Sequence, residues 1–122
     1  MANTFRVVTF AAEPASAGTA YTMYTVPSST TTVVIGLILT NINTTSVTAE
    51  VELVSDTATT VNTGAAAANG TAFLVKDVNI PAGSSLEVLT GGKVILQTTD
   101  VLRVDCSVAD KLSGTLSIME IT

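Results

Sequence analysis

Two carboxylates on one face of a predicted strand are the residues whose spacing best suits catalysis. Glu50 and Glu52 lie two positions apart in a segment that alternates apolar and polar residues, so they point the same way, roughly 7 Å apart. Carboxylates near this separation can act in glycoside hydrolysis. Neighbouring glutamates on a solvated sheet face are also ordinary, and we interpret this pair in that way. We therefore expect no catalytic residues and no enzyme.

The other familiar chemistries lack their residues. The chain has no histidine, which removes the Ser-His-Asp triad and the commonest metal ligand. Gly91-Gly92 lacks the Lys-Ser/Thr of a phosphate-binding loop. Asp100, Asp105 and Asp110 do not have the spacing of an EF-type calcium loop, and we interpret them as turn caps and solubilising groups. We expect no metal site and no cofactor.

Cys106 is the single cysteine, so an intrachain disulfide and a zinc site of several cysteines are both excluded. In the predicted strand around it, Cys106 shares one face with Leu102, Val104 and Val108. This pattern predicts a small buried hydrophobic residue rather than a reactive thiol.

Aromatic residues make up 4% of the chain and tryptophan is absent, which leaves few candidates for a sugar-stacking platform. Tyr21 and Tyr24 are those candidates. Strict alternation places them on opposite faces of one strand, so we expect at most one of them on any such surface, and core packing for both. Asn43 and Asn69 begin glycosylation sequons, but no secretion signal accompanies them.

The elements that position these residues are predicted to be short strands. Residues 32–55 are interpreted as a β-hairpin, with a central strand over 33–39 covered on both faces and a half-exposed strand over 47–53. Further strands are expected at residues 3–10, 19–26, 71–78, 85–90, 93–97, 101–107 and 115–121. Gly91-Gly92 is expected to close a two-residue hairpin, and residues 56–70 to form a contact-making loop.

Eight or nine strands separated by turn signals predict an all-β fold, an antiparallel β-sandwich of jelly-roll or Ig-like kind. We expect one domain over residues 1–122. Residues 1–18 are either its first strand or an arm exchanged with a neighbouring subunit.

Composition favours association with other protein subunits. Hydrophobic residues make up 47% of the chain and charged residues 12%, with a mean hydropathy of +0.54. This scarcity of charge predicts a homo-oligomer. A net charge of −5 argues against nucleic-acid binding. The longest apolar run falls short of the roughly 20 residues of a membrane helix, and the first residues lack a signal peptide, so we expect no membrane contact and cytosolic synthesis.

Two stretches resemble small virion proteins of tailed phages. Residues 24–41 combine a Tyr-Thr-Val-Pro turn, an apolar strand and an Asn-containing turn. Residues 74–89 and 93–104 contain a Pro-Ala-Gly turn and an acid–apolar–Arg–Val strand, which precede a final strand ending in Glu-Ile. The resemblance extends over about residues 22–121.

The resemblance implies a capsid decoration (cement) protein. Such a protein would bind the outside of the major capsid protein lattice as a homo-oligomer, expected to be a trimer, on a virion made in the host cytoplasm. A tail, neck or fibre protein of the virion, or a host-glycan-binding module, is the alternative. The resemblance carries over no catalytic residues.

Overall fold

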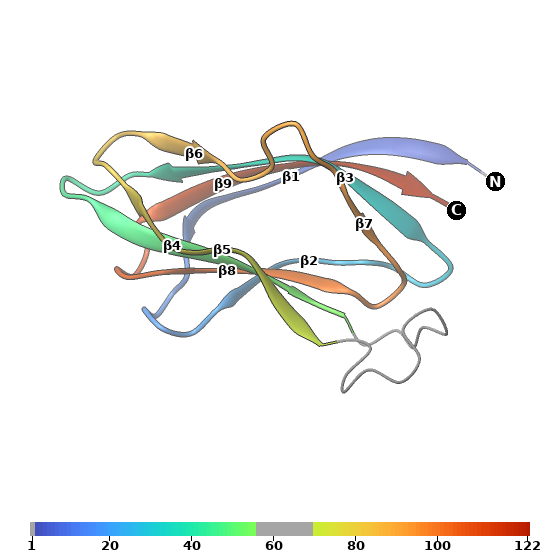
Figure 1. Ribbon diagram of the computed structural model, residues 1–122, viewed down its shortest axis with the longest axis horizontal. Helices are drawn as coiled ribbons and strands as arrows, with labels where there is room; N and C mark the ends of the chain where they lie inside the picture. The colour runs from blue at the N-terminus through green and yellow to red at the C-terminus, as the bar shows by residue number, and fades with distance from the viewer. Residues whose placement is uncertain (1, 56–69) are drawn as a thin grey trace.

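The protein is an antiparallel β-sandwich, described by a computed structural model over residues 2–55 and 70–122. The described residues form nine strands and no helix: β1 (Asn3–Glu13), β2 (Tyr21–Thr25), β3 (Thr31–Asn41), β4 (Val47–Val54), β5 (Thr71–Ile80), β6 (Ser85–Glu87), β7 (Val94–Leu96), β8 (Val101–Cys106) and β9 (Leu112–Ile121). Figure 1 shows the two layers, with the N- and C-termini side by side at one end. The predicted all-β sandwich is confirmed.

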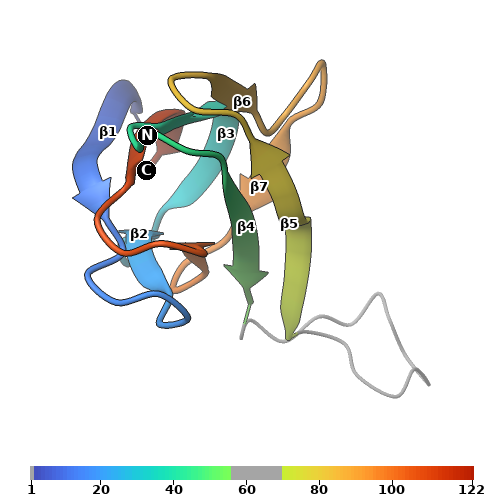
Figure 2. The ribbon, with the colours of Figure 1, turned by 90° about the vertical axis from the view of Figure 1, so that its left-hand side faces the viewer.

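The strands are distributed over two sheets. Sheet A has the order β1-β9-β3-β6, with β7 also paired to β3, and sheet B has the order β2-β8-β4-β5. The chain crosses between the sheets at most connections, so strands that are hydrogen-bonded neighbours are mostly distant in sequence. Figure 2 shows the sandwich end-on, with β1 and β2 together along one side.

The core lies between the sheets because alternate residues of each strand point inward. In β8, in β9 and in β4 as far as Val51, every second residue is buried, as period-two alternation predicts. The largest fully buried side chains are aliphatic: Leu37, Leu39, Ile80, Leu96, Leu102, Leu112, Leu116, Ile118, Val26, Val34, Val47 and Val51.

Strand β3 is central in its sheet, but the prediction that both its faces are covered is wrong. β9 pairs with one edge of β3, and β6 and β7 pair with the other. The described residues form two layers, however, and none of their strands covers the outer face of sheet A. Ile35 and Ile38 are 39% and 44% exposed there. A register shift between Val34 and Gly36 places the extra residue, Ile35, in a bulge.

The predicted hairpin over residues 32–55 is also wrong, because β3 and β4 belong to different sheets. The expected turn chemistry is present but joins the two layers. Asn41 is fully buried, its Nδ2 donates hydrogen bonds to the carbonyls of Thr45 and Ile80, and its Oδ1 accepts one from the Asn43 amide. Asn41 thereby fastens the end of β3 in sheet A to the end of β5 in sheet B.

Gly91 and Gly92 do not close a hairpin between β6 and β7. Both strands pair with the same edge of β3, β6 opposite residues 38–40 and β7 opposite residues 32–34. They are two pieces of one interrupted edge strand, and the glycines lie in the loop between them. Gly91 has φ +74°, a left-handed conformation that glycine adopts without steric cost.

Strand β9 begins at Leu112, three residues before the strand expected over residues 115–121. Gly114 is buried inside this strand because the Phe10 ring packs on it. A glycine within a strand is typical of such close approach. In the sequence, Ser113-Gly114 has the composition of a turn, so the strand was expected to begin after it.

Two predicted features fall partly or wholly outside the described residues. The predicted loop lies at 56–69, apart from its last residue, Gly70, and the Asn69 sequon begins there. At the N-terminus, β1 pairs with β9 of its own chain, and exchange of residues 1–18 with a neighbour stays a prediction. None of the residues that the structure describes forms a helix capable of spanning a bilayer.

Candidate functional site

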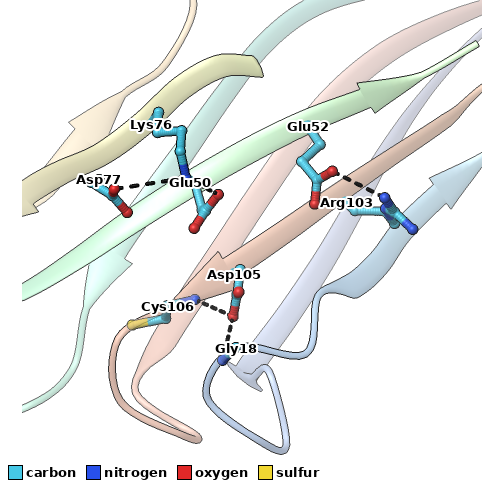
Figure 3. A network of polar contacts seen from close by, with 8 residues as sticks. All are labelled: Gly18, Glu50, Glu52, Lys76, Asp77, Arg103, Asp105 and Cys106. Carbon is cyan, nitrogen blue, oxygen red and sulfur yellow. Dashed lines mark hydrogen bonds and ion pairs between the residues drawn. The ribbon is translucent and has the colours of Figure 1, made fainter. Parts of the chain in front are cut away.

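The outer face of sheet B carries the two glutamates considered for catalysis, and each has a cationic partner. Glu50 and Glu52 both point outward from β4, as predicted. The Lys76 ammonium donates to Glu50 Oε2 at 3.2 Å, and Arg103 Nη2 donates to Glu52 Oε2 at 3.0 Å. Figure 3 shows the pairs bridging neighbouring strands. They form an ion-pair ladder that stabilises the sheet, with each carboxylate engaged separately.

Lys76 is the centre of a small cluster on β5. Its ammonium lies 4.7 Å from the centroid of the Phe73 ring and 3.7 Å from Asp77 Oδ2. The hydrogen bond to Glu50 raises the pKa of Lys76 above its ordinary value. Asp77 has φ +50° where the β4–β5 pairing shifts register, so β5 is bulged at this edge.

The three aspartates considered for calcium are placed in separate structural roles. Asp100 Oδ2 accepts from the Gln97 amide within a turn. Asp105 Oδ1 accepts from the amides of Gly18 and Cys106. Asp110 lies in a turn with φ +59°. In the part of the chain that the structure describes, no group of three or more His, Cys, Asp or Glu residues is arranged to hold a metal ion.

A hollow of about 150 Å³ lies on the outer face of sheet B, and Glu50, Asp77 and Asp105 are among the residues that line it. Its volume is below the roughly 300 Å³ at which ligand pockets usually begin. Its acidic lining and small size give no reason to assign a ligand.

Cys106 is buried in the core beside Leu102 and Val104, as predicted, whereas Val108 is 36% exposed. The prediction that Tyr21 and Tyr24 face opposite ways is wrong. The β2–β8 register shifts between Thr22 and Tyr24, and this bulge turns both tyrosines toward the core, where they are partly buried. The Phe10 and Tyr21 rings meet edge to face, with centroids 5.2 Å apart. The expected core packing is confirmed.

A polar cluster at one end of the sandwich was not predicted. Glu120 points inward and its side chain is 9% exposed. Its carboxylate accepts hydrogen bonds from Tyr24 Oη at 2.6 Å and from Arg6 Nε at 2.5 Å. Thr32 Oγ1 lies 2.9 Å from Tyr24 Oη. The sequence did contain a signal that Glu120 points inward, because it lies two and four positions after the buried residues Ile118 and Leu116 in the same strand.

The contacts in this cluster change the pKa values of Tyr24 and Glu120. Burial, followed by the hydrogen bond to Glu120, raises the pKa of Tyr24 to about 12. The hydrogen bond from Tyr24, together with Arg6, lowers the pKa of Glu120 below its ordinary value of 4.5. The folded state therefore holds the carboxylate ionised.

We expect Glu120→Gln to lower the free energy of unfolding by about 1–3 kcal/mol at neutral pH, because charge-assisted hydrogen bonds are lost. A carboxyl whose pKa is lowered on folding stabilises the protein above its unfolded pKa, and this contribution is lost as pH falls through the folded value. The difference between wild type and variant should thus shrink below pH 4.5. Urea titrations from neutral to acidic pH measure it, and a constant difference would contradict the assignment.

The outer face of sheet A carries an apolar row, in contrast to the ion pairs on sheet B. A row of directly opposed residues crosses four strands: Phe5 of β1, Met119 of β9, Val33 of β3 and Ile95 of β7. Phe5 and Ile95, at the two ends, are 72% and 64% exposed.

We name this surface the apolar face; it consists of Phe5, Val7, Val33, Ile35, Ile38, Ile95, Met119 and Ile121. Among the described strand residues that point outward from sheet A, Glu87, opposite Ile38, is the charged one. Ser117 and Thr115 also point outward on this side of the sheet. Exposed apolar side chains gathered on one face are typical of interaction sites.

Comparisons with protein-family models, with curated proteins and with solved structures find no match. The resemblance to phage virion proteins stays a prediction.

Function is therefore inferred from the surfaces of the chain itself. The apolar face can bind by removing hydrocarbon from water, which requires a partner with a complementary apolar surface. On the outer face of sheet B, Glu50 is paired with Lys76 and Glu52 with Arg103.

Proposed function

We propose that this chain is a capsid decoration (cement) protein of a phage virion. It binds the outside of the major capsid protein lattice as a homo-oligomer, a trimer if the resemblance holds, and stabilises the shell. The observation that supports this proposal best is the four-strand apolar row from Phe5 to Ile95, exposed on an otherwise stable sandwich. A protein that functions by covering another surface needs such a face.

Binding by the apolar face would be driven by burial. Each exposed aliphatic or aromatic side chain that becomes fully buried contributes about 1.5–3 kcal/mol. The ion-paired face of sheet B, with Glu52 bonded to Arg103 and Glu50 to Lys76, would remain toward solvent. Linking several subunits makes their combined attachment much tighter than one contact, so a modest face on each subunit suffices to clamp a lattice.

Cryo-electron microscopy of the virion tests the proposal directly. The expected result is density for this sandwich over the outer surface of the head, in a copy number comparable to that of the major capsid protein. Density confined to the tail would contradict it. A tail, neck or fibre protein, the runner-up, predicts few copies per particle.

The host-glycan alternative depends on Tyr21 and Tyr24 as the aromatic residues that would contact a sugar. Both pack toward the core and are partly buried, which reduces the ring surface that a sugar could contact. Glycan-array binding that is abolished by substituting either tyrosine, in variants that remain folded, would revive this alternative.

Substitution of Ile95 tests which face binds. Ile95→Asp places a charge at one end of the apolar row, within the proposed contact, and we expect capsid affinity to fall about tenfold or more. Ile95 is 64% exposed, so the fold should be unaffected. Co-sedimentation with capsids assembled without the chain measures the change.

The matched control is Phe73→Asp, which introduces the same charge at an exposed apolar position on sheet B. Phe73 is 47% exposed and lies opposite Glu52 on the ion-paired face. We expect this variant to bind capsids as the wild type does. Loss of binding by Phe73→Asp with retention by Ile95→Asp would reverse the assignment of the faces.

A further inference from the structure

Strand β1 has an open edge whose backbone polarity can be read from its pairing with β9. Ala2 and Thr122 exchange both backbone hydrogen bonds, at 3.1 and 2.9 Å, and the register continues unbroken to Phe10 opposite Gly114. Bonded and non-bonded pairs alternate in antiparallel strands, so the even-numbered residues of β1 bond to β9. The amides and carbonyls of the odd-numbered residues 3, 5, 7 and 9 therefore point away from β9, and no described strand pairs with them.

The other sheet edges in the described part of the chain carry features that block strand addition. β2 has five residues and a register shift. β5 has two register shifts, with Asp77 in a left-handed conformation and Lys76 beside it. β6 and β7 have three residues each. Short, bulged or charged edges are the usual protection against edge-to-edge pairing.

The β1 edge lacks this protection. Residues 3–10 contain no proline and no register shift. Their one charged side chain, Arg6, is bonded to Glu120. Long, regular edge strands of this kind are the ones that pair with another chain.

We propose that the β1 edge pairs with the β1 edge of a second copy of this chain, antiparallel about a two-fold axis, to give a dimer with one continuous sheet. Pairing of two edges requires that both of them be unprotected. A second copy of the chain meets this requirement, because it presents the same β1 edge. With Val7 on the axis, Phe5 lies opposite Thr9 of the second copy and Arg6 opposite Val8, so no like charges meet.

The geometry joins the two apolar faces. Residues that exchange hydrogen bonds across the new seam must both be odd-numbered, and the odd-numbered side chains of β1 point outward. Phe5 and Val7 of both copies therefore lie on the same surface, and the apolar row continues from one sheet A into the other.

The available area fits a reversible contact. Eight residues of β1 extend about 26 Å, and the side of the sandwich that carries β1 and β2 is two sheets deep (Figure 2), about 20 Å with side chains. The contact is therefore about 500 Å² per partner, below the roughly 800 Å² of a standard interface. We expect a dimer whose population rises with protein concentration.

Val7→Pro tests the seam. It removes an amide that faces the open edge and leaves the β1–β9 hydrogen bonds intact, so the fold should persist. We expect the dimer dissociation constant to rise at least about tenfold, measured by sedimentation equilibrium over a concentration series. Val7→Thr, which keeps the amide and the branched side chain, is the control and should stay within about threefold of wild type.

Amide hydrogen exchange on the unmodified protein supplies a second readout that does not depend on the variant folding. The amides of Phe5, Val7 and Thr9 should become protected as concentration rises, whereas those of Arg6 and Val8 should be protected throughout. Exchange of the odd-numbered amides that is equally fast at all concentrations would overturn the proposal.

The oligomeric state decides the remaining outcomes. A wild-type protein that is monomeric at all concentrations, or the trimer that the resemblance implies, would overturn the dimer, as would a Val7→Pro variant that dimerises normally. The test needs no capsid, so its failure is distinct from failure of the proposed function. A dimer with the expected properties that does not bind capsids would support this inference and contradict the decoration role.

Discussion

Replacing Asn41 by Asp is expected to lower the free energy of unfolding by about 3 kcal/mol or more. The Asn41 side chain is fully buried, and its Nδ2 lies 2.9 Å from the carbonyl oxygens of both Thr45 and Ile80. The substitution replaces this donor with a carboxylate oxygen. Two acceptors then lose their donor and a charge is buried against them, and each unsatisfied buried group costs about 1–3 kcal/mol. Urea denaturation at neutral pH measures the change.

Asn43→Asp is the matched control, since it makes the same chemical change two residues away. Asn43 Nδ2 donates to the Thr45 hydroxyl at an exposed position, at 3.2 Å. We expect a change within about 0.5 kcal/mol. Equal losses for the two variants would contradict the conclusion that the Asn41 side chain fastens the two sheets together.

Gly114→Ala is expected to destabilise the fold by about 1–3 kcal/mol through overpacking. A Cβ at this position would lie only 2.2 Å from Phe10 Cε1. The ring cannot easily withdraw because it is buried and packs edge to face on Tyr21. Thermal and urea unfolding of the variant test this expectation.

A double-mutant cycle with Phe10→Leu isolates the cause. Leucine is shorter than phenylalanine and leaves room beside Gly114, so in this background Gly114→Ala should cost less than about 0.5 kcal/mol. The coupling between the two positions should accordingly reach about 1 kcal/mol or more, as for residues in direct contact. Additive losses would contradict the conclusion that contact with the Phe10 ring sets the cost.

Most strands were predictable, because burial of alternate residues leaves a local signal of period two. The strand around Cys106 and the outward direction of Glu50 and Glu52 follow from this signal. The partners of Glu50 and Glu52, Lys76 and Arg103, lie on other strands and were not predicted, because strand order is set by packing between distant segments.

Bulges explain why the predicted direction of the Tyr24 side chain was wrong. They also contribute to the wrong prediction that both faces of β3 are covered. One extra residue reverses the direction of every later side chain in a strand. The shift after Thr22 turns Tyr24 inward, and the bulge at Ile35 changes the inward parity of β3. Nothing in the local alternation marks these insertions, because the hydrogen bonds that accommodate them come from β8 and β9.

The amino-acid sequence by itself determined that this protein is all-β, with alternating strands, a buried cysteine and little charge. Only the tertiary structure decided that ion pairs cross the outer face of sheet B, that an apolar row crosses sheet A from Phe5 to Ile95, and that β1 keeps an open edge. The physical reason is that side-chain alternation is a property of one strand. Faces and edges exist only once strands from distant parts of the chain are hydrogen-bonded in one order and register.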